Sequence, residues 1–157
     1  MLRFQEDLAF SEKVTDDLLK ALLKTEVRKC TDASLQKAGV DFWVLREGRW
    51  LAVDLKVSRH PYRERILVEI LEYPKVGLPK PGWAARLGKT EAVLFFYFRP
   101  KVMAIEVSFI ELYAYARRRL YEVLLGAKTD SSVIREGRIA LFDLPETKTF
   151  EHKIYTL

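Results

Sequence analysis

The sequence has few of the residues that build disulfides and soft-metal sites. Its 157 residues include one cysteine, Cys30, and two histidines. One cysteine excludes an internal disulfide framework and a cysteine-based zinc site, and two histidines leave little for a histidine-rich metal centre. If the chain binds a metal, we therefore expect a hard cation with oxygen ligands.

Long apolar runs are also missing. No apolar stretch approaches the ~18 residues needed to cross a bilayer, and the N-terminal sequence MLRFQEDLAF is too polar for a signal peptide. These absences predict a cytoplasmic protein with no membrane partner.

The sequence contains enough apolar residues to form a hydrophobic core. Hydrophobic residues make up 49% of the chain, which predicts one compact domain spanning residues 1–157. The net charge of +5 gives mild support to a polyanionic partner, although plain soluble proteins often carry a similar excess of Lys and Arg.

The stretch 40–56, VDFWVLREGRWLAVDLK, predicts two consecutive strands joined by a tight turn at REGR. Asp41 opens the first strand. On the second, Asp54 and Lys56 project from the same face, since they are two residues apart. An isolated Asp-x-Lys is usually an ordinary ion pair on an exposed strand. Here the neighbouring apolar residues indicate that both faces of the strand are buried, and a second acid, Asp41, begins the adjacent strand.

This trio has a specific chemistry. Asp41 and Asp54 converging from adjacent strands make a hard oxygen site for Mg²⁺ or Mn²⁺, with the backbone carbonyl of Leu55 as a natural third ligand. Such a metal supports attack of water on a phosphodiester. Lys56 would orient or deprotonate the nucleophile, or stabilise charge on the phosphate.

These residues resemble the motif of the PD-(D/E)XK nuclease superfamily, which includes restriction endonucleases and Holliday-junction resolvases. The match is VD followed thirteen positions later by DLK, with Val40 in place of the motif's proline and Asp54 in place of the commoner glutamate. It covers Leu8 to about Phe98. The resemblance implies a single-domain α/β fold of restriction-endonuclease type, with a mixed central β-sheet flanked by helices. It also implies Mg²⁺- or Mn²⁺-dependent cleavage of nucleic acid, with DNA the favoured substrate and endonuclease action favoured over exonuclease action.

Residues 4–24 carry a helical pattern that bears on the same site. If this helix is continuous, Glu12 lies within its apolar stripe, about 20° from Leu19, whereas a break near Ser11 would weaken that placement. In the resembling nucleases the first helix lays an acid beside the metal, which selects Glu12, with Asp16 as second choice. The alternative is that Glu12 only borders the core.

The polar connector 31–40, TDASLQKAGV, precedes Asp41. Within the resemblance, LQKAGVDF is similar to the Q-x-x-G-[IV]-D entrance of a catalytic strand, which implies that Gln36 holds the site or touches the substrate. The alternative is a solvated loop glutamine.

A basic loop follows Lys56. Arg59, Arg63 and Arg65 cluster around His60 and Pro61, where we expect phosphate contacts that give affinity without sequence specificity. The alternatives are a basic loop with no partner and an acid/base role for His60.

Residues 66–73 predict a third strand interrupted by Glu69. Related nucleases often carry an acid there and a GW pair a dozen or so residues later, which corresponds to Glu69 as an additional acid and to Gly82-Trp83. Trp83 would stack on a base or sugar, or it would fill the rim of the core.

The remaining chain predicts a buried central strand at EAVLFFYF, a strand at KVMAIEV, a helix ending at Gly126 and a last strand at GRIALFDLP. The arginines 117–119 lie around that helix, which suggests a solvated surface at least as much as a DNA-binding one. Two other functions stay open: a catalytically silent nucleic-acid-binding module of the same fold, and a structural subunit. The sequence also leaves open whether a homodimer is needed to cut two strands.

Overall fold

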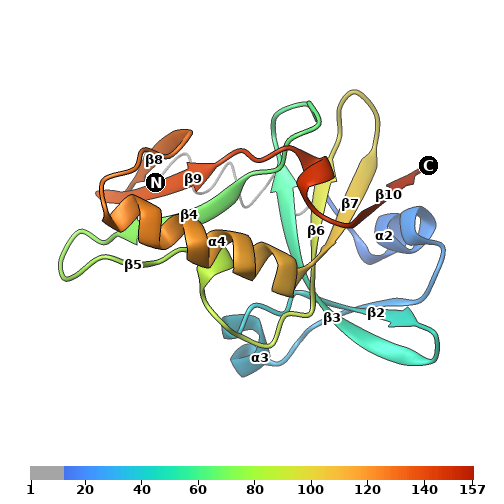
Figure 1. Cartoon of the computed structure of the whole chain (residues 1–157). Coiled ribbons are helices and arrows are strands. Elements are labelled where there is room, and N and C mark those ends of the chain that lie inside the picture. The colour runs from blue at the N-terminus through green and yellow to red at the C-terminus, as the bar shows by residue number, and fades with distance from the viewer. Residues whose placement is uncertain (1–12) are drawn as a thin grey trace. The chain divides into compact units, whose positions relative to one another are not determined.

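The computed structural model describes residues 13–157, which divide into two compact units (Figure 1). Unit 1 holds the described part of Met1–Arg63 together with Gly88–Ser108 and His152–Leu157, and unit 2 holds Glu64–Leu87 and Phe109–Glu151. Each unit has its own sheet. The mixed α/β class is confirmed, whereas the expectation that all strands share one central sheet is wrong.

The sheet of unit 1 has six strands and is mixed, because β3 and β6 run parallel while the other neighbouring pairs are antiparallel. The strands in sheet order are β1 (Val27–Lys29), β2 (Phe42–Arg46), β3 (Arg49–Ser58), β6 (Ala92–Tyr97), β7 (Met103–Ser108) and β10 (His152–Thr156).

The hairpin of β2 and β3 forms where the sequence predicts it. Its turn residues Glu47 and Gly48 both have positive φ angles, 50° and 75°. A two-residue turn of this kind matches the right-handed twist of the flanking strands. It fixes a register in which Phe42 pairs with Val53.

The predicted buried strand is β6, in the middle of this sheet, and every one of its residues is buried. The helix α2 (Asp16–Leu23) contributes Leu19, Leu22 and Leu23 to the same core cluster as Phe96. The sheet of unit 1 is thus held by apolar packing on the side that faces α2, which stabilises the strands carrying the site.

The start of α2 corrects one prediction. Thr15 is extended and caps the helix by accepting a hydrogen bond from the Leu18 N–H, so a helix continuous over residues 4–24 is wrong. The geometric placement of Glu12 depended on that continuity, and Glu12 itself lies outside the described residues. The connector 31–40 is also more ordered than expected, since it contains the short helix α3 (Ala33–Lys37), capped by the Asp32 carboxylate.

The sheet of unit 2 has four strands in the order β5 (Lys80–Pro81), β4 (Val68–Tyr73), β9 (Arg138–Asp143) and β8 (Ser131–Arg135), all antiparallel. The helix α4 (Phe109–Leu124) packs on β4 and on the short 3₁₀ helix η1 (Trp83–Ala85), and a second 3₁₀ helix, η2, spans Thr147–Thr149. Within residues 13–157, no helix has the length and apolar character of a membrane span.

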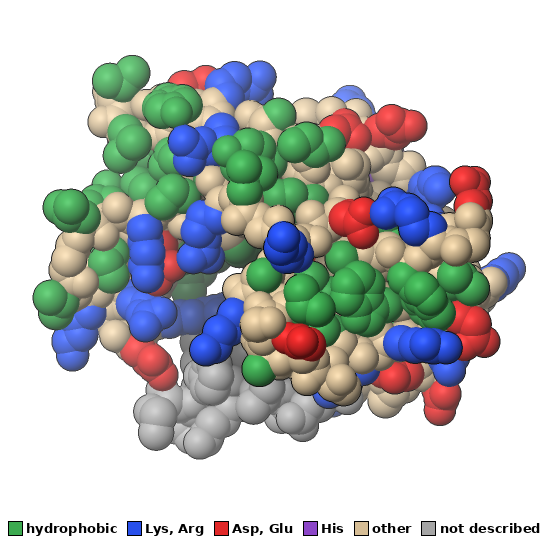
Figure 2. Space-filling model, turned by 90° about the horizontal axis from the view of Figure 1, so that it is seen from below, with side chains coloured by type: hydrophobic (Ala, Val, Ile, Leu, Met, Phe, Trp, Pro, Cys, Tyr) green, Lys and Arg blue, Asp and Glu red, His purple; other side chains and the backbone are tan. Residues whose placement is uncertain are grey.

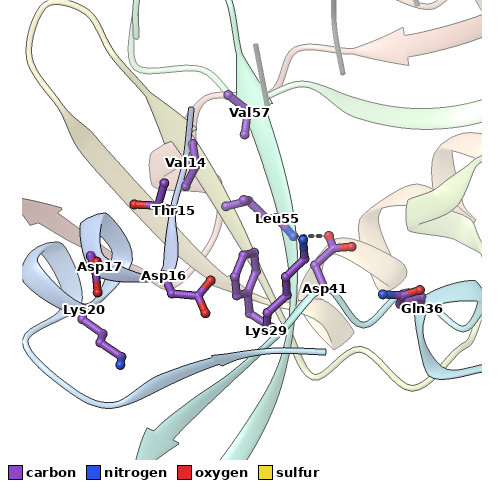
Figure 3. A pocket seen from close by; sticks show the side chains of 11 residues that line it. Val14, Thr15, Asp16, Asp17, Lys20, Lys29, Gln36, Asp41, Leu55 and Val57 are labelled. Carbon is purple, nitrogen blue, oxygen red and sulfur yellow. Dashed lines mark hydrogen bonds between the residues drawn. The ribbon is translucent and has the colours of Figure 1, made fainter. Parts of the chain in front are cut away.

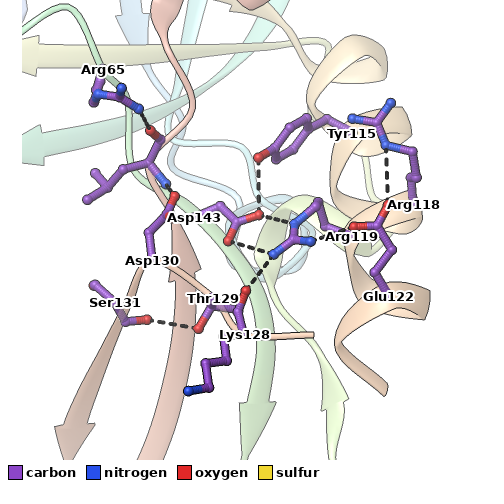
Figure 4. A network of polar contacts seen from close by, with 11 residues as sticks. Arg65, Tyr115, Arg118, Arg119, Glu122, Lys128, Thr129, Asp130, Ser131 and Asp143 are labelled. Atoms are coloured by element: carbon purple, nitrogen blue, oxygen red, sulfur yellow. Dashed lines mark hydrogen bonds and ion pairs between the residues drawn. The ribbon is translucent and has the colours of Figure 1, made fainter. Parts of the chain in front are cut away.

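A buried charge network ties α4 to β9 (Figure 4). The Asp143 carboxylate accepts hydrogen bonds from the Arg119 Nε at 2.5 Å and from the Tyr115 hydroxyl at 3.1 Å. Burial, and then the nearby Asp143 charge, raise the pKa of Tyr115 to about 12, which keeps this hydroxyl a donor. Arg119 is thus largely buried in an ion pair, so neither the solvated nor the DNA-binding interpretation of residues 117–119 describes it.

Candidate functional site

The hairpin brings Asp41 and Asp54 together. Asp41 directly precedes β2, whose first residue Phe42 pairs with Val53, the neighbour of Asp54, and the Asp41 and Asp54 carboxyl groups are in contact. The Asp41 N–H donates to the Val53 carbonyl at 2.9 Å, and the Asp41 Oδ2 accepts the Leu55 N–H at 2.8 Å. Asp41 is thus fixed at both its backbone and its carboxylate, at the edge of β3.

Asp54 is the electrostatically unusual member of the pair. Its side chain is only 13% exposed, and its Oδ2 lies 3.2 Å from the Nζ of Lys56, whose side chain is 35% exposed. Burial raises the pKa of Asp54 to about 7; the Lys56 ammonium opposes this rise and the contact with Asp41 adds to it. The Asp41 and Asp54 carboxyl groups are therefore in contact, with the Lys56 ammonium beside Asp54.

The backbone at Leu55 completes the arrangement. In a strand the N–H and C=O of one residue point to the same side. Because the Leu55 N–H points to the Asp41 carboxylate, the Leu55 carbonyl points to the same open edge, beyond the start of β2. A third oxygen therefore lies on the same side of β3 as the Asp41 carboxylate, and its role as a metal ligand stays a prediction.

An open pocket of about 980 Å³ adjoins Asp41 on the α2 side of the sheet. Figure 3 shows Asp16, from the first turn of α2, and Asp41 on different walls, with Lys29 extending into the space. Asp54 and Lys56 alternate along β3 with the pocket-lining residues Leu55 and Val57, so they project from the other face of that strand. Only Asp41 belongs to both the pocket and the acid pair.

Gln36 lies in the wall of this pocket. Its Nε2 donates to the Cys30 carbonyl at 2.8 Å, which fastens α3 to the chain just before it. Gln36 therefore lines the same pocket as Asp41. Its hydrogen bond to Cys30 also gives Gln36 a role in holding α3.

The basic loop is divided. Arg59 and Arg63 belong to unit 1, but Arg65 belongs to unit 2, where it donates to the Leu144 carbonyl at 2.7 Å and pairs with Glu146 at 3.6 Å. A structural role accounts for Arg65, which weakens the idea that all three arginines serve one nucleic-acid surface.

Glu69 and Trp83 also lie in unit 2, on β4 and η1, and not in the sheet that carries Asp41. The Glu69 Oε1 accepts the Trp83 N–H at 3.1 Å, and a Cβ on Gly82 would lie 2.5 Å from the Glu69 carbonyl oxygen. The predicted third strand, which carries Glu69, therefore belongs to the second sheet and not to one central sheet, and the role of Glu69 as an additional acid stays a prediction. Close packing around Gly82 explains the GW pair structurally.

The arrangement suits a cation that needs few protein ligands. Within residues 13–157, no group of three or more Asp, Glu, His or Cys side chains is placed to hold a metal. Mg²⁺ commonly takes one or two carboxylates and fills its remaining positions with water and substrate phosphate. Asp41, Asp54 and the Leu55 carbonyl fit that donor set, whereas a zinc or calcium site would need more protein donors.

The sequence analysis did not identify Lys29. Its side chain lines the pocket together with that of Lys20. Strand β1 is only three residues long, so its pattern is weak. The signal that could have found Lys29 is its spacing of two from the buried Val27, which puts both side chains on the face that α2 covers.

Comparison of the chain with family models, with curated proteins and with solved structures finds no match. Functional inference therefore rests on the residues and their geometry.

Proposed function

We propose that the chain is a metal-dependent nuclease that hydrolyses phosphodiester bonds, in DNA rather than RNA, at Asp41, Asp54 and Lys56. The observation that carries the proposal is the contact between the Asp41 and Asp54 carboxyl groups with the Lys56 ammonium 3.2 Å from Asp54. We propose with it that the chain is a PD-(D/E)XK nuclease of restriction-endonuclease type.

Each residue has a role that its surroundings support. Asp41, Asp54 and the Leu55 carbonyl would hold Mg²⁺ or Mn²⁺, which supplies a Lewis acid that neutralises phosphate charge and acidifies water. The Leu55 N–H keeps the Asp41 carboxylate in place at 2.8 Å. Lys56 is partly exposed, so its ammonium can face both Asp54 and the charge that develops on a phosphate oxygen. Water adds to phosphorus, the bond to the leaving oxygen breaks, and that oxygen takes up a proton.

The unfavourable electrostatics of the pair support a functional reading. Two carboxyl groups in contact, one of them buried, destabilise the charged state of a metal-free protein. A stabilising ion pair would need only one of these acids beside Lys56. Sites that bind cations or perform acid–base chemistry commonly keep such pairs despite the cost to stability.

A catalytically silent nucleic-acid-binding module is the second candidate. The lysines that line the pocket, Lys20 and Lys29, favour an anionic ligand whether or not cleavage occurs. Retention of both acids and of Lys56 favours the enzyme, because binding alone needs no carboxylates facing a polyanion.

The proposal is tested by measuring DNA cleavage and DNA binding on wild-type protein and on the Asp54→Asn variant. We expect wild-type protein to cut plasmid and linear duplex DNA in Mg²⁺ or Mn²⁺ and not in EDTA. Asp54→Asn should lose cleavage by at least about two orders of magnitude while its affinity for DNA, measured in Ca²⁺ or EDTA, stays near wild type.

A matched control is Asp130→Asn, which removes one carboxylate from unit 2, where Asp130 accepts the Leu144 N–H at 2.7 Å. It should cleave like wild type. DNA binding without metal-dependent cleavage would favour the silent module, and absence of both would refute the proposal.

A further inference from the structure

One end of unit 2 exposes apolar side chains, four aliphatic and one aromatic, that the proposed site does not use. In the loop between β4 and β5, Val76 and Leu78 are 87% and 85% exposed. Across the sheet, Tyr73 pairs with Ile139 and Ile139 with Ile134, and all three of these side chains are also exposed. Single exposed apolar side chains are common on soluble proteins, but a group of them gathered at one end indicates a binding surface.

The loop and the β8–β9 turn form one surface. A Cβ on Gly137, in that turn, would lie 3.3 Å from the Cδ of Lys75, so the lysine stem packs against the turn. We call residues 73–80 and 134–139 together the aliphatic–basic end. Figure 2, which keeps the left and right of Figure 1, shows hydrophobic and basic side chains interleaved on the left, where Figure 1 places β5, β8 and β9.

The charge of this end selects the kind of partner. Its two segments contain four basic residues, Lys75, Lys80, Arg135 and Arg138, and one acidic residue, Glu136. Arg138 also pairs with Glu72 at 3.6 Å, so Lys75, Lys80 and Arg135 supply the remaining positive charge of this end, against Glu136. A basic rim around an apolar tip complements a polyanion that can also accept apolar contacts.

We infer that the aliphatic–basic end binds duplex DNA in the minor groove and inserts Val76 and Leu78 as a wedge. The chemistry favours a duplex over a single strand, because single-strand surfaces stack successive bases on several aromatic side chains. This end exposes one aromatic side chain, Tyr73, and its tip, Val76 and Leu78, is aliphatic. Aliphatic wedges flanked by lysine or arginine are typical of proteins that unstack a base step and bend the duplex. The inference shares with the proposed function only the premise that DNA is the ligand.

The tip has the shape that a wedge requires. Val76 and Leu78 flank Gly77, whose φ of 107° is open to glycine and strained for other residues, so the loop turns sharply there. Pro79 follows and limits the freedom of the chain. Both aliphatic side chains are thus presented by a tight turn, and less conformational entropy is lost when they enter a groove.

Binding and bending of a 20-base-pair duplex in EDTA test the inference without any cleavage. Energy transfer between end labels should report a bend of about 20–90° with wild-type protein. Val76→Ser/Leu78→Ser should lose most of the bend. Lys75→Gln/Lys80→Gln should weaken binding to every sequence and reduce the slope of log K against log salt by about 2.

Two controls match these changes. Ile110→Ser/Ile154→Ser removes two exposed aliphatic side chains elsewhere and should bend the duplex like wild type. Lys101→Gln/Lys148→Gln removes two exposed lysines outside the aliphatic–basic end and should keep the salt slope. Circular dichroism should show that all variants are folded.

The inference is overturned if wild-type protein binds the duplex without bending it, or if the Val76/Leu78 variant bends it equally. It is also overturned if that variant loses only self-association in sedimentation, or only binding to anionic phosphatidylserine vesicles, since either would assign the surface to another partner. Because EDTA excludes cleavage, these outcomes are independent of the proposed nuclease activity. Absence of Mg²⁺-dependent cleavage would leave a bending result intact.

Discussion

Replacing Asp54 with asparagine should stabilise the metal-free protein, and the gain should grow with pH. Burial holds the pKa of Asp54 at about 7, against 3.8 for an ordinary aspartate. Between these two values the native state keeps a proton that the unfolded chain has released. Stability therefore falls as pH rises from about 4 to about 7, and it becomes level above that.

The magnitude follows from the width of this window. Each pH unit within it is worth about 1.4 kcal/mol, so wild-type protein should lose roughly 2–3 kcal/mol of unfolding free energy between pH 5 and pH 8 through Asp54 alone. The asparagine variant lacks this titration. Changes in packing caused by the substitution act equally at both pH values, so the difference between the two pH values isolates the charge.

Urea unfolding in EDTA at pH 5 and pH 8 measures the effect. Trp43 and Trp50 report on unit 1 and Trp83 on unit 2, and circular dichroism checks whether the transitions coincide. A gain that is the same at both pH values would show that Asp54 titrates normally and would refute the electrostatic argument. Loss of stability at pH 8 would indicate that Asp54 and Lys56 form an ordinary stabilising pair.

Three further predictions concern neighbouring features. Because the Lys56 ammonium lowers the pKa of Asp54, Lys56→Gln should extend the fall in stability above pH 7, which pH-dependent unfolding would show; an unchanged window would contradict it. Arg119→Ala should cost about 3–5 kcal/mol in urea unfolding, because it leaves the buried Asp143 carboxylate without its cation, whereas the exposed Arg118→Ala should cost less than about 1 kcal/mol. Gly82→Ala should destabilise unit 2 by about 1–3 kcal/mol, measured by Trp83 fluorescence, because its Cβ would meet the backbone of Glu69; a neutral effect would mean that this contact relaxes freely.

The hairpin was predictable because two local signals agree. Alternation along the second strand indicates β-structure, and the Glu-Gly turn fixes the register, so the meeting of Asp41 and Asp54 follows from the chain itself. The continuous apolar run of β6 marks the centre of the sheet for a similar reason. The degree to which Asp54 is buried depends on distant parts of the chain, and no local pattern encodes it.

The second sheet was not predictable in the same way. Alternation identifies β4 and β9 as strands but not the sheet that each one joins, which depends on pairing between distant segments. Strand β8 was missed because its residues are mostly exposed, although REGR recurs at residues 135–138 with the same positive φ angles, 51° and 80°, in its turn. Strand β10 was missed because it lies at an edge and is half exposed. The sequence TDD at Thr15–Asp17 is a capping pattern that could have placed the start of α2 correctly.

Two aspartates, Asp143 fully buried and Asp54 largely buried, differ in how well their surroundings balance their charge. Asp143, 1% exposed, receives a guanidinium and a hydroxyl, so its burial is balanced by its partners and needs no further explanation. Asp54 is buried beside another carboxyl group and one partly exposed lysine, and its raised pKa shows that these partners do not balance its charge. Folding alone would favour an uncharged residue at position 54. In the proposed nuclease a divalent cation held by Asp41 and Asp54 would supply the missing charge. The growth of the asparagine variant's stability gain with pH measures how much charge is missing.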